Sequence, residues 1–134
     1  MDKAAGGSAN YMFLGNLNTM GQNMTYINKG ISGNKELSRL KKRAAAARVK
    51  MTVFEKSVPS GVNEQVTIWP GSRSSLNPSN FDYVMATDHL RFKQFGGSPV
   101  DLRGWPQETT AAKRDAWATA FSDHALLYFE VQKA

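Results

Sequence analysis

The stretch Ser122-Asp123-His124, followed by the apolar run from Leu126 to Val131, decides how this chain is interpreted. A short continuous apolar run is typical of a buried strand. An acid and an imidazole side by side at the start of such a strand can hold a metal ion and direct the imidazole toward a phosphate. The same pair would also suit a plain helix end, because a histidine interacts favourably with a helix C-terminus. We therefore expect a closing strand, with Asp123 and His124 as candidate site residues.

Further apolar runs predict the other strands of one sheet. The runs from Tyr11 to Leu17 and from Phe81 to Ala86 are continuous, as expected for strands that are buried on both faces. Shorter strands are expected at residues 51–54 and 66–69. Apolar and charged residues alternate over residues 90–95, which predicts a half-buried strand.

Two segments have the residue spacing of helices. In the first, Asn34 is the expected N-cap, and the apolar residues that recur at helical intervals are Leu37, Leu40, Ala44 and Ala47. In the second, Thr109 or Thr110 is the expected N-cap. Its apolar positions are Ala112, Ala116, Trp117, Ala120 and Phe121. This order of elements predicts an α/β fold with one mixed, mainly antiparallel sheet and two helices on one face.

The composition is that of a single globular domain. The chain has 134 residues, of which 41% are hydrophobic and 10% aromatic. Residues 1–9 are small and polar, and we interpret them as a flexible leader before one domain at 10–134. The absence of cysteine excludes disulfides and cysteine-bound zinc. No apolar run has the length of a membrane span, so we expect no membrane partner and a cytoplasmic location.

The positive charge of the chain is concentrated in one segment. The formal net charge is +6, and residues 35–56 alone carry eight basic and two acidic side chains. A charge run on a helix is usually a solvated face. The alternative is a surface that binds the phosphate backbone of a nucleic acid. Its candidate residues are Arg39, Lys41, Lys42 and Arg43.

Three short motifs follow one another along the chain. They are Gly15-Asn16-Leu17-Asn18, Asn80-Phe81-Asp82-Tyr83-Val84 and Ser122-Asp123-His124. In this order, with a helix before the last, they resemble the C-terminal half of the endonuclease/exonuclease/phosphatase family, which includes pancreatic DNase, exonuclease III and the apurinic endonucleases. The resemblance covers residues 11–131, and Thr67-Ile68-Trp69 is similar to a Thr-Trp pair that precedes the second motif in the family.

The resemblance implies a fold, a reaction and a set of roles. The fold is half of a four-layer α/β/β/α sandwich, and the reaction is phosphodiester hydrolysis that depends on Mg²⁺ or Mn²⁺. By resemblance, Asp123 contributes to metal binding, His124 contacts the scissile phosphate and Asp82 orients His124. Asn18 would hold the phosphate, and Asn16 stands where the family has the aspartate that orients or activates the attacking water.

Two departures from the family predict impaired hydrolysis. An amide at Asn16 can hydrogen-bond a water but cannot accept its proton, which lowers the expected rate by orders of magnitude. The family's N-terminal half, which supplies an Asn and the principal metal-binding Glu, has no counterpart in the sequence. The alternatives are a non-catalytic relative that binds phosphate or nucleic acid, and a structural dimeric fragment. In these, Asn16 and Asn18 are strand-end turn residues, and Asp82 caps a turn.

The expected partners follow from the apolar strands. Half of a sandwich leaves one sheet face uncovered, and an exposed apolar sheet of that size favours association. We therefore expect a homodimer through the sheet face, or a second chain that supplies the missing half. The expected ligand is a nucleic acid or another phosphodiester.

Overall fold

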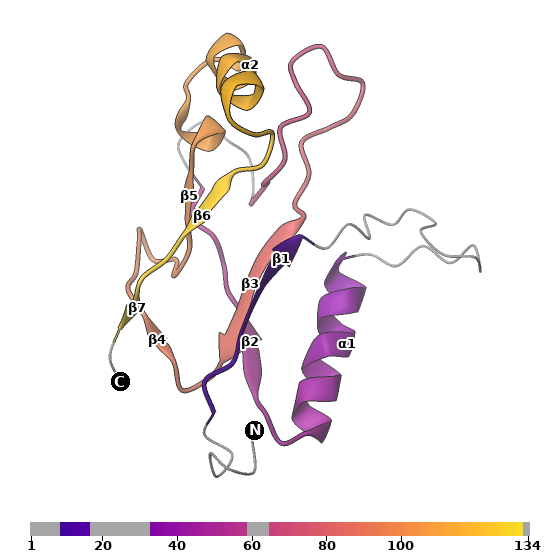
Figure 1. Ribbon diagram of the computed structural model, residues 1–134, viewed down its shortest axis with the longest axis vertical. Helices are drawn as coiled ribbons and strands as arrows, with labels where there is room; N and C mark the ends of the chain where they lie inside the picture. Colours follow the sequence, from indigo (N-terminus) through magenta and orange to yellow (C-terminus); the bar gives the residue numbers. More distant parts are fainter. Residues whose placement is uncertain (1–8, 17–32, 59–64, 133–134) are drawn as a thin grey trace, which may run out of the picture. The chain divides into compact units, whose positions relative to one another are not determined.

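The computed structural model describes residues 9–16, 33–58 and 65–132 (Figure 1). These residues form two α-helices and several short strands, whose assigned ladders are antiparallel, so the predicted α/β class is confirmed. The chain divides into two compact units, which are described separately below. The first comprises Met1–Phe54, Tyr83–Arg91 and Val131–Ala134, and the second comprises Glu55–Asp82 and Phe92–Glu130. The predicted leader at 1–9 lies outside the described residues except for Ala9.

The first unit is built around a three-stranded sheet in the order β1-β3-β2. Its strands are β1 (Met12–Asn16), β2 (Met51–Val53) and β3 (Asp82–Thr87). β2 and β3 are antiparallel, with Met51 opposite Thr87. Every residue of β3 from Tyr83 to Thr87 is buried, as the continuous apolar run predicts for a central strand.

The helix α1 (Gly33–Ala46) of the first unit confirms the first predicted helix, one residue earlier than the expected N-cap. Leu37 is buried and packs in one cluster with Tyr83, Phe13 and Val53. The four predicted binding cations on this helix are all exposed: Arg39, Lys41, Lys42 and Arg43. The helix is therefore amphipathic, as its apolar spacing indicates.

The second unit has its core beside the antiparallel pair β5 (Asp101–Arg103) and β6 (Leu126–Tyr128). Buried Leu102, Trp105 and Ala125 form this core. Trp105 belongs to the short 3₁₀ helix η1 (Trp105–Gln107), which precedes α2 (Ala111–Ala120). Between β5 and η1, Gly104 has a φ of 85° and lies against the Trp117 ring, where any Cβ would collide with the indole. A glycine is therefore required between β5 and η1, where the Trp117 ring of α2 packs against the backbone.

The prediction of one continuous sheet is wrong. In addition to the three-stranded sheet, the described residues form two separate two-stranded sheets, β4-β7 and β5-β6. The strand expected over 90–95 shortens to β4 (Arg91–Phe92), because Gly96 and Gly97 turn the chain with positive φ. The strand expected over 126–131 splits into β6 and β7 (Val131–Gln132). Residues 66–69 form only isolated bridges.

The second predicted helix exists, but its predicted apolar face is mostly exposed. Thr110 is the N-cap, and its side chain accepts a hydrogen bond from the Lys113 amide. Only Trp117 packs against the core of the second unit, whereas Phe121 is 75% exposed. The three alanines predicted on this face are exposed: Ala112, Ala116 and Ala120. The reason is that one large indole covers the contact, and short alanine side chains do not extend it.

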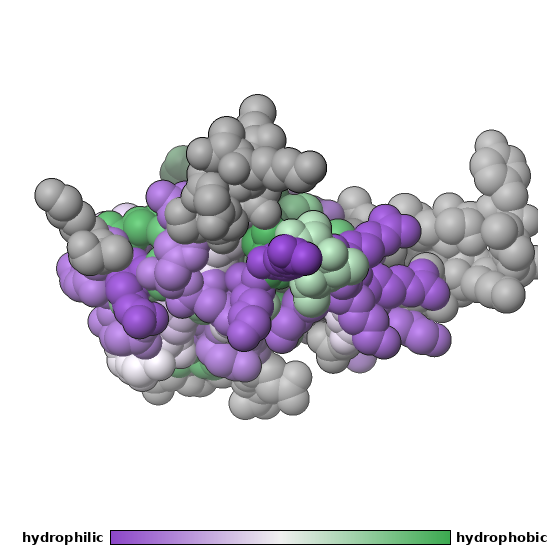
Figure 2. Space-filling model, turned by 90° about the horizontal axis from the view of Figure 1, so that it is seen from below, coloured by the Kyte–Doolittle hydropathy of each residue, from purple (hydrophilic) through white to green (hydrophobic). Residues whose placement is uncertain are grey.

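The surface is polar over most of the face in Figure 2, where apolar side chains show only in small patches. Large apolar side chains are exposed on individual strands, including Leu14 of β1 at 52% and Leu126 of β6 at 58%. Among the described residues, no helix combines the length and the apolar character that a membrane crossing needs.

Candidate functional site

The strongest chemical feature is a hydrogen bond between two side chains that are 42 residues apart. The Nδ1 atom of His124 lies 2.9 Å from Oδ2 of Asp82. The Asp82 side chain is 13% exposed, whereas the His124 side chain is 37% exposed. The carboxylate is therefore largely covered and fixes one ring nitrogen, while the ring itself remains open to solvent. We call Asp82, Asp123 and His124 the His124 site.

A buried threonine holds the backbone that carries Asp82. The Thr67 side chain is fully buried, and its hydroxyl oxygen accepts hydrogen bonds from the amides of Phe81 and Asp82, each at 3.0 Å. The carbonyl of Thr67 accepts a hydrogen bond from the Ala125 amide at 2.7 Å. One residue therefore connects the segment before β3 to the segment that follows His124.

The neighbours of Thr67 extend this connection. Ile68 forms isolated antiparallel bridges with both Ser79 and His124. The Trp69 amide donates to the carbonyl of Asp123 at 2.8 Å. Residues 67–69 thus lie between the two segments that contribute the site and set their register. The sequence signals for this role are the apolar run at 66–69, which predicts a strand, and the similarity of Thr67-Ile68-Trp69 to a Thr-Trp pair.

A buried lysine lies next to the same segment, and sequence reasoning missed it. Lys56 is 2% exposed, and its Nζ donates to Oδ1 of Asn80 at 2.8 Å. Burial lowers the pKa of Lys56 to about 8, against the opposing attraction of Asp82 and Glu55. In the sequence, Lys56 is one more cation of the basic segment, so its charge alone gave no reason to place it inside the protein.

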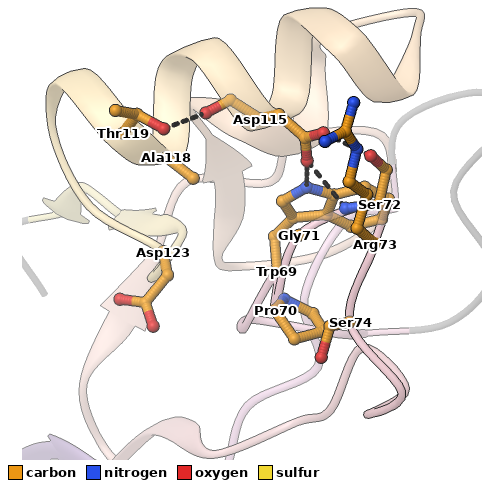
Figure 3. A pocket seen from close by; sticks show the side chains of 10 residues that line it. All are labelled: Trp69, Pro70, Gly71, Ser72, Arg73, Ser74, Asp115, Ala118, Thr119 and Asp123. Atoms are coloured by element: carbon orange, nitrogen blue, oxygen red, sulfur yellow. Dashed lines mark hydrogen bonds between the residues drawn. The ribbon is translucent and has the colours of Figure 1, made fainter.

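Asp123 lies at the edge of a hollow of about 460 Å³ (Figure 3). Its lining includes the exposed residue Asp123 and the side chains of Trp69, Arg73 and Asp115. Hydroxyl groups of Ser72 and Thr119 add further polar surface. This hollow begins one residue from His124 and is lined by both polar and apolar side chains.

The opposite wall of this hollow is fixed by Asp115 of α2. Its carboxylate accepts hydrogen bonds from the Trp69 indole at 2.7 Å, from the Ser72 amide at 2.8 Å and from the Ser72 hydroxyl. The Ser72 hydroxyl and the Trp69 indole hold the pKa of Asp115 below its ordinary value. Asp115 is thus a structural acceptor that ties the loop after Trp69 to α2, as the dashed lines in Figure 3 show.

The carboxylates do not gather into a metal centre within the described ranges. No group of three or more His, Asp or Glu side chains there is placed to hold a metal ion. Mg²⁺ in proteins is usually held by one or two carboxylates together with waters and ligand phosphates. Asp123 offers a single carboxylate, which is the lower end of what this ion usually takes from a protein.

The remaining predicted residues belong to the first unit or lie outside the described residues. Asn16 ends β1 in the first unit, where its side chain is exposed, and Asn18 lies outside the described residues. Two of the predicted cations, Lys41 and Lys42, line a second hollow of about 390 Å³ together with Lys50. The other two, Arg39 and Arg43, are exposed on the same helix.

Comparison with known proteins adds no family to this description. No family model matches the chain, and neither a curated protein nor a solved structure matches it. The functional assignment therefore depends on the geometry of the His124 site.

Proposed function

We propose that this chain is an endonuclease/exonuclease/phosphatase-like domain whose His124 site binds a phosphodiester. The single observation that carries the proposal is the 2.9 Å contact between Asp82 and His124, formed between two of the motifs on which the resemblance rests. An imidazole backed by a carboxylate and open on its other side is suited to phosphate recognition and proton transfer.

The chemistry follows from which ring nitrogen is occupied. Asp82 accepts the hydrogen bond from Nδ1–H of His124, so Nε2 is the nitrogen left for a ligand. When the ring is protonated, Nε2–H donates to a non-bridging phosphate oxygen and offsets the charge that develops there. In hydrolysis, a water oxygen bonds to phosphorus while the bond to the leaving oxygen breaks. Holding the phosphate is the step that His124 and Asp82 supply.

Hydrolysis is impaired in this chain, because Asn16 stands where the family has an aspartate. Without a carboxylate there, the attacking water keeps its proton until another base takes it. The proposed Mg²⁺ or Mn²⁺ would use Asp123 together with waters and ligand phosphates, since no group of three or more His, Asp or Glu side chains among the described residues is placed to hold it.

The proposed architecture is half of a four-layer sandwich that pairs through its sheet face. On β1, exposed and half-buried residues alternate, and the exposed ones include Met12 at 36% and Leu14 at 52%. A row of apolar side chains on one face of a strand supports pairing with a second copy, or with a chain that carries the other half. Sedimentation tests this: a stable monomer at micromolar concentration in the absence of a second chain would contradict the homodimer.

The decisive test of the site compares the two histidines of the chain. We expect dimethyl phosphate, titrated against the protein and followed by NMR, to shift the His124 ring signals saturably and to leave those of His89 unchanged. Asp82→Asn should weaken this response about tenfold, because the amide leaves the imidazolium without its counter-charge. The proposal would be contradicted by equal responses of both rings. It would also be contradicted if His124 did not respond to dimethyl phosphate at about 0.1 M, a concentration well above the Kd of a weak site.

A second experiment asks whether the lost carboxylate limits hydrolysis. Asn16→Asp should raise cleavage of bis(p-nitrophenyl) phosphate in Mg²⁺ or Mn²⁺ by about 10²-fold or more, since a positioned base typically contributes that much. Asn10→Asp, which also adds one carboxylate to the first unit, is the control and should leave the rate unchanged. A rate that stays at background in Asn16→Asp, with His124 still binding phosphate, would favour the non-catalytic alternative.

That alternative, a surface that binds nucleic acid without cleaving it, has its own observation. One hollow in the first unit is lined by Lys41, Lys42 and Lys50 together with the carboxylate of Asp88, and the neighbouring cations of α1 are exposed. Three ammonium groups against one carboxylate leave a net positive charge, which favours a phosphate oxygen there. The affinity for DNA falls as salt rises, and removing Lys41 and Lys42 should make this slope of log K against log salt shallower by about 1 to 2. Removing Arg91 and Lys113 is the comparison for this change. Equal slopes for the two pairs would exclude this surface.

A further inference from the structure

The β5–β6 pair has an outer face that the site described so far does not use. Leu102 of β5 lies opposite Leu127 of β6, and both pack in the core of the second unit. The neighbouring pair in the same ladder is Arg103 and Leu126. Because successive side chains of a strand point to opposite faces of the sheet, Arg103 and Leu126 lie on the face away from this core.

His124 lies on this outer face as well. The side chains that follow it alternate: Ala125 is buried in the core, Leu126 is 58% exposed, and Leu127 packs inward again. Tyr128, the last residue of β6, therefore lies on the same face as His124 and Leu126. With a rise of about 3.3 Å per residue, the positions of His124 and Tyr128 are separated by about 13 Å along the strand.

The guanidinium of Arg103 is held in place at the far end of this face. Its Cζ lies 3.5 Å from the centroid of the Tyr128 ring, and its Nε donates to Oδ2 of Asp101 at 2.9 Å. Asp101 is fixed in turn by the Ser57 hydroxyl, which donates to its Oδ1 at 2.7 Å. Among the residues that the structure describes, no hydrogen bond or ion pair involves the two terminal nitrogens of Arg103. An arginine fixed through its plane and its Nε presents these remaining donors as a fork that matches a phosphate group.

The acidic groups near Arg103 leave this fork open. Asp101 accepts a hydrogen bond from the Nε edge alone. The Glu130 carboxylate accepts hydrogen bonds from Nζ of Lys93 at 3.0 Å and from the Tyr128 hydroxyl at 2.8 Å. Each of these two carboxylates is paired with a cation, so a phosphate on this face meets no uncompensated negative charge from them.

We propose that Arg103 is a second phosphate-binding residue, and that a single-stranded nucleic acid lies along this face with one phosphate at His124 and a later one at Arg103. A separation of about 13 Å exceeds the reach of one phosphodiester, whereas a chain of several phosphodiesters spans it. Between the two residues, the exposed Leu126 offers an apolar surface to a base, which only an unpaired strand can turn toward the protein. The inference rests on the proposed function for the phosphate at His124, and it assigns the class of ligand.

The test compares a short ligand with a long one. Thymidine dinucleotide has one phosphodiester, which His124 alone can hold. Thymidine tetranucleotide has three, and its outer two can reach both residues. Dissociation constants are measured by NMR from the amide signals of Ala125 and Leu126. In Arg103→Ala, the tetranucleotide should bind about tenfold more weakly, because its charge-assisted hydrogen bonds are lost, and the dinucleotide should stay within about twofold.

Two further variants and a matched control define the role of the guanidinium. Arg103→Lys keeps the charge and a donor for Asp101 but loses the fork, so it should weaken tetranucleotide binding about threefold. Tyr128→Leu removes the ring beneath the guanidinium and should have an effect of similar size, about threefold. Lys113→Ala removes an exposed charge from the same unit and should leave both dissociation constants within about twofold. If Arg103→Ala does not fold, Arg103→Lys decides.

The outcomes separate this inference from the proposed function. The inference is overturned if the Arg103 variants, shown to be folded by far-UV circular dichroism, bind the tetranucleotide as wild type does, or if both ligands weaken equally. It is also overturned if a tetraglutamate peptide binds as tightly as the tetranucleotide and loses as much affinity in Arg103→Ala. If neither ligand shifts the His124 ring signals but tetranucleotide binding still depends on Arg103, the proposed function fails and the phosphate site at Arg103 stands.

Discussion

The chain contains two Asp-His pairs, and the structure gives them different surroundings. Asp88 and His89 follow β3 in the first unit, where the Asp88 carboxylate accepts a hydrogen bond from the Thr52 hydroxyl at 2.7 Å. His89 Nε2 lies 2.6 Å from Oδ1 of Asn10, and both the acid and the ring are exposed. Nothing about the two dipeptides themselves distinguishes them, since both place an aspartate before a histidine.

The second pair differs in what stands behind the ring. His124 faces the Asp82 carboxylate, which is largely covered, whereas His89 faces an amide at the surface. A carboxylate supports a positive charge on the imidazole and fixes its tautomer, and an exposed amide supplies neither to a comparable degree. The two histidines are therefore distinguished by their partners across the fold, not by the residue that precedes each of them.

The largest expected effect is a difference between the two histidines in catalysis. In the Asn16→Asp background, His124→Ala should lower kcat for bis(p-nitrophenyl) phosphate by about 10² to 10⁴, as loss of a positioned acid–base group does. His89→Ala should leave kcat within about twofold, because the ring is exposed and its hydrogen-bond partner, Asn10, is an exposed amide. Steady-state rates for the two variants provide the measurement. Comparable losses in both would show that the Asp82 contact does not distinguish the rings.

The next effect concerns the lysines of the two regions. Lys56 is buried with its pKa lowered to about 8, whereas Lys50, whose carbonyl accepts the Asp88 amide, has an exposed side chain. Below pH 8, Lys56 is protonated in both the folded and unfolded chain, and the folded state bears the full unfavourable burial of its charge. Between pH 8 and 10.5 the unfolded chain binds more protons, so the free energy of unfolding rises with pH.

The size of this rise follows from the shift of about 2.5 pH units from the ordinary 10.5. It corresponds to about 3 kcal/mol. Urea unfolding of wild type and Lys56→Met at pH 7.5 and pH 10.5 should show this contribution only in wild type, and Lys50→Met should behave as wild type does. The difference between variants removes the effect of all other titrating groups. Parallel pH dependence in all three proteins would contradict a depressed pKa for Lys56.

Much of the fold follows from hydrophobic spacing, and the same spacing explains the errors. Leu37 lies on the buried side of α1, and the run 81–86 contains the central strand. Both were predictable because buried apolar residues recur in the sequence with the period of the helix or strand that they belong to. The alanines of α2 have the same spacing but too little side chain to reach the core. A pattern of small residues therefore predicted a helix correctly and its buried face incorrectly.

The site was predictable in part for a different reason. The motifs pointed to Asp82 and His124, which the structure brings into contact. Lys56 was not identified, and Thr67 was noted only through its similarity to a Thr-Trp pair, because the sequence alone does not distinguish a buried polar side chain from an exposed one. Their roles depend on partners that lie 14 and 24 residues along the chain, Phe81 for Thr67 and Asn80 for Lys56. No local pattern records such pairings.

The smallest of the expected effects compares the threonines that serve the two regions. Thr67→Val removes the one acceptor shared by two backbone amides in a fully buried position, while the valine fills the same space. Leaving buried donors unsatisfied should lower the free energy of unfolding by about 2 kcal/mol. Thr52→Val removes an exposed hydrogen bond to Asp88 and should change it by less than about 0.5 kcal/mol. Urea unfolding measures both.

Thr67→Ser separates the hydroxyl from the methyl group. Serine keeps the acceptor for both amides, so its loss should be limited to the buried methyl group, about 1 kcal/mol. The backbone at Asp82 should also stay in place in this variant, and the NMR response of His124 to dimethyl phosphate should resemble wild type. In Thr67→Val that response should weaken, because the carboxylate behind the ring is no longer held. If valine and serine reduce stability equally and neither alters the His124 response, Thr67 is a packing residue and the alignment of Asp82 comes from elsewhere in the second unit.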